Sequence, residues 1–177
     1  TVNTGDAWST GSLALTNNGG TTTYAGTTSA LFAGTTVGQP ENNIKVGSTG
    51  TKCITVNSAG SLAGNLRLFR GTVSGTNSAA VAPQLQLTVD AAPVAAATNV
   101  AANCTGFPAT GLTNLGSAVA LSAYPSTYAG ATGVAVAAGT QRVAYRISWT
   151  VTTTGSNAGD NALQNSSAVA DLTWEIQ

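Results

Sequence analysis

The sequence contains no histidine in 177 residues and only six acidic and six basic side chains. Histidine is the usual general base near neutral pH and a common metal ligand. Its absence excludes the HExxH zinc proteases and the Ser-His-Asp and Cys-His arrangements of hydrolases. The acidic residues are scattered along the chain, at Asp6, Glu41, Asp90, Asp160, Asp171 and Glu175. We therefore predict a structural or binding protein and not an enzyme.

Charge is scarce as well as scattered. Charged residues make up 7% of the chain, against about 25% in ordinary soluble proteins. The formal net charge is zero, so we expect neither a nucleic-acid partner nor a basic patch for an anionic membrane surface. No apolar run approaches the roughly 20 residues that a membrane-spanning helix needs. A surface without net charge also favours association between copies of the chain.

Other binding motifs are missing. A Walker-type phosphate loop needs Gly directly before Lys, and neither Lys45 nor Lys52 follows a glycine. Asp160 with Asn157 and Asn161 resembles part of a calcium loop, but the EF-hand spacing and its closing Glu are lacking. We therefore expect no metal ion and no cofactor.

The two cysteines, Cys53 and Cys104, lie too far apart for a zinc knuckle or a redox pair. A single structural disulfide is the favoured interpretation, and two buried thiols are the alternative. The sequence begins at Thr1 without an initiator methionine or a basic n-region, as a processed product would. Both features predict a secreted, extracellular protein.

The length suits one domain, and the dominant pattern along the chain is alternation with a period of two. From Arg142 to Val151 every second residue is apolar, which predicts a strand at the centre of a sheet. Ala170, Leu172, Trp174 and Ile176 repeat this pattern and predict a second core strand. If the two strands are neighbours, Arg142 and Arg146 could pair with Asp171 or Glu175.

Weaker alternation marks further strands, around Leu13 and Leu15, Cys53 to Val56, Leu66 and Leu68, and Leu85 to Val89. Turn-rich stretches separate them, at residues 17–20, 47–50, 71–77 and 155–160. The stretch from Ala91 to Ala102 contains Pro93 and is expected to be a loop, with a short helix as the alternative. Many short strands of this kind predict an all-β, antiparallel, jelly-roll-like sandwich with long loops and little helix.

Two sequons make Asn103 and Asn165 candidate glycosylation sites. Chance alone would produce about this many in a chain so rich in Asn, Ser and Thr. Lysine isopeptide crosslinks would have to use Lys45 or Lys52, and the sequence singles out neither.

Several stretches, in order, resemble the TasA and camelysin family of secreted prokaryotic matrix proteins and the related archaeal bundling pilins. Residues 6–15, DAWSTGSLAL, are similar to the opening of that family. Residues 52–56, KCITV, with 60–62 and 66–68, resemble its second recognisable block. Residues 165–168 and the closing LTWEIQ of 172–177 look like its last strand.

The resemblance implies a jelly-roll-like sandwich whose copies form an extracellular filament of a biofilm matrix or a cell-surface pilus. In such filaments the N-terminal segment of one subunit completes a sheet of the next. It would make residues 1–10 the donor segment and residues 11–177 the sandwich domain. The donor strand itself would comprise Thr1, Val2, Asn3, Thr4, Gly5, Asp6, Ala7 and Trp8. Camelysin has been described as a protease, but the absence of histidine and of a carboxylate cluster argues against that activity here.

Two alternatives remain open from the sequence. The N-terminal segment is polar and contains Gly5, so it could be a frayed tail, with Trp8 an ordinary core residue. The protein could also be a monomeric secreted adhesin or a carbohydrate-binding sandwich. Such a module would need exposed aromatic side chains, and Tyr24, Tyr124 and Tyr128 are the candidates for its platform. Other matrix or surface proteins are conceivable partners beside copies of the chain itself.

Overall fold

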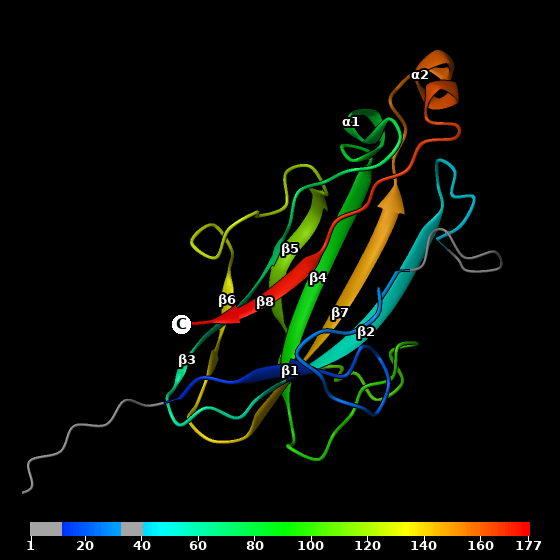
Figure 1. Ribbon diagram of the computed structural model, residues 1–177. Coiled ribbons are helices and arrows are strands. Elements are labelled where there is room, and N and C mark those ends of the chain that lie inside the picture. The colour runs from blue at the N-terminus through cyan, green and yellow to red at the C-terminus, as the bar shows by residue number, and fades with distance from the viewer. Residues whose placement is uncertain (1–11, 33–40) are drawn as a thin grey trace, which may run out of the picture.

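The computed structural model describes residues 12–32 and 41–177 (Figure 1). The donor-strand candidate, Thr1 to Trp8, lies outside the described residues. The elements are short strands and two small helices, in the order β1 (Leu15–Asn17), β2 (Thr49–Ser58), β3 (Gly64–Arg70), α1 (Ser78–Val81), β4 (Leu85–Val94), β5 (Thr113–Ala120), β6 (Gly133–Val136), β7 (Gln141–Val151), α2 (Asn157–Ala162) and β8 (Leu172–Ile176).

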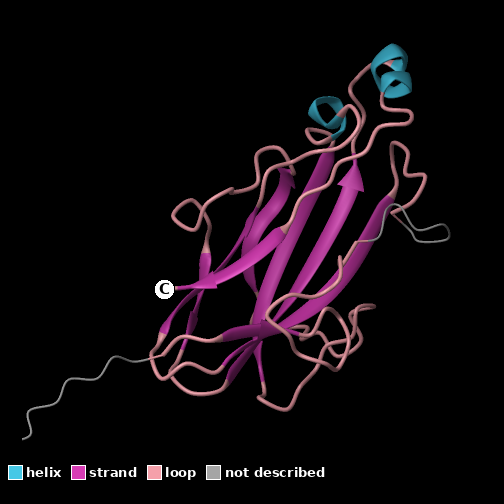
Figure 2. Ribbon diagram, in the orientation of Figure 1, coloured by secondary structure: helices cyan, strands magenta, loops and turns pink. Residues whose placement is uncertain are grey.

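The described strands form two antiparallel sheets (Figure 2). One has five strands in the order β1-β2-β7-β4-β5, and the other has three in the order β6-β3-β8. The main apolar core lies between them, with Ile54 and Tyr145 contributed by the larger sheet and Leu66 and Leu68 by the smaller one. The expected all-β antiparallel sandwich with little helix is confirmed.

Strand β7 lies at the middle of the five-stranded sheet, as its alternation predicts. Val143, Tyr145 and Ile147 face the core and are almost completely buried. The strand pairs with β2 on one side and β4 on the other, each along ten residues. Because both edges are hydrogen-bonded, the strand is held along nearly its whole length.

Strand β7 and the C-terminal strand are not neighbours, which was the condition for pairing Arg142 and Arg146 with Asp171 or Glu175. Strand β8 belongs to the other sheet and pairs with β3. Arg146 instead donates from Nη2 to Oδ2 of Asp90 on β4, at 2.7 Å. Alternation shows which face of a strand is buried, but it does not show which strand lies beside it. The pairing partner of β8 could therefore not be predicted from the sequence.

Other expectations need smaller corrections. Ala91 to Val94 extend β4 and are not part of a loop, and Pro93 is tolerated because β5 has already ended opposite Ala91. The turn expected at residues 47–50 is shorter, since β2 begins at Thr49. Strands β5 and β6 and both helices were not predicted, because their Gly, Ala and Ser residues give little periodic signal.

Candidate functional site

The outer edge of β8 is the most conspicuous feature of the smaller sheet. Asn65 and Gln177 exchange two backbone hydrogen bonds, of 2.8 and 3.3 Å. In an antiparallel ladder such pairs alternate with pairs whose amides point away from each other. Along β8 the amides of Thr173 and Glu175 therefore point toward β3, and those of Leu172, Trp174 and Ile176 point outward.

The outward set continues upstream of β8, because Gly71 bonds to Asp171 and Ser74 bonds to Val169 in the same alternation. The outward residues have no backbone hydrogen-bond partner within residues 12–32 and 41–177, and they are Ala168, Ala170, Leu172, Trp174 and Ile176. Their side chains pack on the core. The edge thus offers a row of amides that no described residue pairs, above a row of apolar side chains.

A second edge lies next to the first. Strand β1 is the edge of the larger sheet, and it comes close to β8. Ser12 and Ala14 bond to the segment that follows β2, so the amides of Leu13 and Leu15 point away from β2. No described residue bonds to those amides, whereas Asn17 is paired with Ala25. We call the region bordered by Leu13, Leu15 and the outward residues of β8 the β1–β8 seam.

The seam also borders aromatic side chains with unused polar groups. Trp174 on β8 meets Tyr145 on β7 edge to face, with ring centroids 5.7 Å apart. The Trp174 indole N–H and the Tyr145 hydroxyl are both buried without a hydrogen-bond partner among the described residues. Burial raises the pKa of the Tyr145 phenol, with a smaller contribution from Tyr124. Buried donors without partners are uncommon in finished protein cores.

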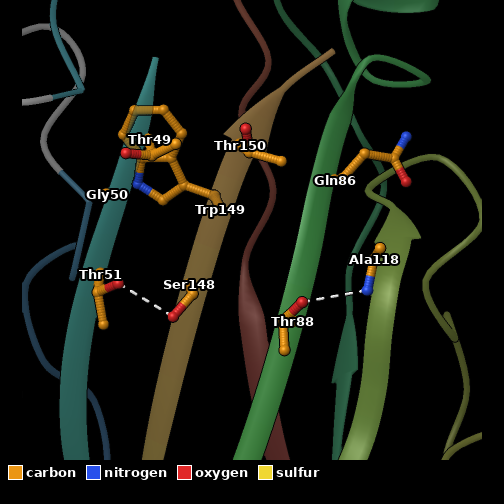
Figure 3. Close-up of a pocket in the computed structure, with 9 residues that line it drawn as sticks. All are labelled: Thr49, Gly50, Thr51, Gln86, Thr88, Ala118, Ser148, Trp149 and Thr150. Carbon is orange, nitrogen blue, oxygen red and sulfur yellow. Dashed lines mark hydrogen bonds between the residues drawn. The ribbon is translucent and has the colours of Figure 1, made fainter. Parts of the chain in front are cut away.

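The outer face of the larger sheet carries a shallow depression of about 240 Å³ (Figure 3). Hydroxyl groups from three strands line it: Thr51 and Ser148 share a hydrogen bond of 3.0 Å, and Thr88 accepts one from the Ala118 N–H. Figure 3 shows the Trp149 indole lying over Gly50 at its upper end. The lining contains no ionisable side chain, so it offers polar contacts but no acid or base.

The tyrosines proposed as a sugar-binding platform do not form one. Tyr124 is buried, and burial raises its pKa to about 12. Arg142 covers the ring of Tyr24, and burial raises the pKa of that phenol. Arg67 stacks on Tyr128 at 4.5 Å. Each ring is already used by the protein itself.

The arginine side chains are engaged in contacts within the protein. All four arginines of the sequence donate to backbone or side-chain oxygens of the protein. Arg142, for example, bonds to the carbonyl of Thr98 and to Asn99. Arg67, Arg70 and Arg142 bond to carbonyl groups of loops, whereas Arg146 bonds to Asp90 of the neighbouring strand β4.

The disulfide between Cys53 and Cys104 is confirmed. It joins β2 to the loop of residues 95–112. On the outer face of the larger sheet, Cys53 packs with Val100 of this loop and Ala144 of β7 in a second small core. Fully buried Asn18 completes this junction. Its Oδ1 accepts from the N–H of Thr55 and Gly20, and its Nδ2 donates to Val100 and Thr21. Sequence inspection treated Asn18 as a turn residue, and only the buried partners show its role.

Both sequon asparagines are exposed, Asn103 beside the disulfide and Asn165 after α2. Among the residues considered as a calcium loop, Asp160 bonds within its own turn. Asp160 accepts hydrogen bonds from the backbone and hydroxyl of Thr154 and from the hydroxyl of Thr153, and these bonds lower its pKa. Within the described ranges no cluster of three potential metal-ligating side chains occurs.

Neither the models of known protein families nor the curated proteins give a match to this chain. Among the residues that the structure describes, no helix is long and apolar enough to cross a membrane.

Proposed function

We propose that this protein is a secreted structural subunit that polymerises by donor-strand exchange into an extracellular filament. The segment Thr1 to Trp8 of one copy would enter the β1–β8 seam of the next. The observation that carries the proposal is the outer edge of β8 and of the segment just before it, where five alternate residues present backbone amides that bond to no described residue, above core-packed side chains. Such an edge accepts an added strand through main-chain hydrogen bonds, as in other forms of β-augmentation.

The dimensions support this assignment. The outward residues run from Ala168 to Ile176, and eight residues of extended chain span about 26 Å, close to the length of that edge. The donor segment contributes Val2, Ala7 and Trp8 as apolar anchors for the seam. Its other residues are polar, so most of the binding would come from the backbone.

The direction of growth follows from the two surfaces. The donor segment and the seam differ, so the contact between copies is heterologous and continues as a filament when it does not close into a ring. The disulfide is compatible with an extracellular location. The resemblance of the sequence to the secreted matrix proteins and the bundling pilins also supports the proposal.

The first test compares the intact chain with a variant that lacks residues 1–8, by negative-stain microscopy. Filaments from the intact chain and none from the truncated one are expected. Monomers from both, in mild acid and at raised salt as well, would refute the filament.

A second test blocks the edge without removing the donor. Ala170→Pro deletes an outward amide and leaves the pairing of β8 with β3 unchanged, because Ala170 points away from β3. We expect a folded, monomeric variant. Ala170→Ser, which keeps the amide, is the matched control and should assemble normally. Normal filaments from Ala170→Pro would show that this edge is not the acceptor.

A further inference from the structure

Lys52 is placed unusually for a lysine. It alternates along β2 with Ile54 and Val56, whose side chains are buried in the core, so it leaves the strand on the core face. Its side chain is only 19% exposed. The other lysine, Lys45, is on an exposed turn before β2.

The amine of Lys52 faces a buried carboxylate. Its Nζ is 4.0 Å from Oε1 of Glu41, whose side chain is 8% exposed. Both carboxylate oxygens of Glu41 are buried, and neither has a hydrogen-bond partner among the described residues. The two groups are therefore close together, but among the described residues the Glu41 carboxylate has none of the hydrogen bonds that normally compensate a buried charge.

We propose that Lys52 and Glu41 form an intramolecular isopeptide bond in the folded protein. An amine and a carboxyl group held next to each other, with little water around either, contain all the atoms that an amide bond requires. The nitrogen of Lys52 is the nucleophile, and the fold holds it beside the Glu41 carboxyl group, which is the electrophile. This proposal does not depend on filament formation, and its test is separate.

The reaction needs no further reagent. The nitrogen of Lys52 attacks the carboxyl carbon of Glu41, and the C–N bond forms as one C–O bond breaks. One oxygen of Glu41 leaves as water with two of the three protons that the amine and carboxyl groups carry between them, and the third stays on the amide nitrogen. The product is a neutral secondary amide that removes two buried charges and ties the segment before β2 to the strand itself.

Intact-mass measurement of the folded, disulfide-bonded protein tests this directly. The expected mass is that of the sequence, less the two hydrogens of the disulfide, less one water. Trypsin should fail to cleave after Lys52, and a branched peptide containing Glu41 should appear. A full-mass protein that releases the linear peptide ending at Lys52 would overturn the proposal.

Matched lysine variants identify the nucleophile. Lys52→Arg keeps the positive charge but cannot condense, so the water should be retained. Lys45→Arg is the control and should still lose it. Loss of water in Lys52→Arg would assign the bond to another residue and overturn the proposal. Should Lys52→Arg fail to fold, the peptide map of the unaltered protein decides the question alone.

Discussion

The indole of Trp149 occupies the space that a side chain at Gly50 would need. The two residues are directly opposite in the β2–β7 ladder. A Cβ atom added to Gly50 would lie 2.6 Å from three atoms of that indole. Trp149 is 6% exposed, so it has little room to move aside.

Gly50→Ala should therefore destabilise the protein by about 1 to 3 kcal/mol, the usual cost of overpacking a core. Chemical denaturation monitored by tryptophan fluorescence measures the change. Gly26→Ala is the control, because a Cβ there meets nothing within 4 Å. Equal stability of the two variants would mean that Trp149 can rotate away.

Asn18 should be the most sensitive polar residue of the described chain. Asn18→Ala leaves the buried Thr55 N–H and the Val100 carbonyl without their partners. The expected loss is about 2 to 4 kcal/mol in the free energy of unfolding, measured by urea denaturation. Asn161→Ala, at an exposed position of α2, should change stability little. A mild effect at Asn18 would show that water replaces its bonds.

Removal of the disulfide should weaken the whole fold. The bridge closes a loop with a sequence separation of 51, and its loss should cost about 3 to 4 kcal/mol. The double variant Cys53→Ala with Cys104→Ala should show this as a lower melting temperature by calorimetry. The unaltered protein should match it once reduced, and an unchanged melting temperature in both would contradict a stabilising role.

The protein should lose stability in alkali. Burial raises the pKa of Tyr124 to about 12 and also raises that of Tyr145. Above the unfolded pKa of about 10 the unfolded chain loses phenolic protons that the folded chain keeps, so the free energy of unfolding falls as pH rises. Tyr124→Phe should flatten this fall.

Between about pH 6 and pH 9 stability should vary little, because the chain has no histidine and the structure describes no free cysteine. Denaturation curves across this range provide the internal baseline for the alkaline measurement. A steep dependence within it would require a group whose pKa differs strongly between the folded and unfolded states.

The sequence by itself determined the fold class, the disulfide and the buried face of β7. Each follows from local information: a period of two, turn residues between strands, and two cysteines in an otherwise unreactive chain. The tertiary structure decided the rest. Only there does β8 pair with β3 and not with β7, and Lys52 meet Glu41.

The open edge of β8 is another feature that only the tertiary structure decides. The alternation of Leu172, Trp174 and Ile176 predicted their inward side chains, but whether their amides are paired depends on the neighbouring strand. The scarcity of charge leaves few electrostatic signals to specify partners in advance. Strand order and register are set by long-range packing, and no local pattern in the sequence records them.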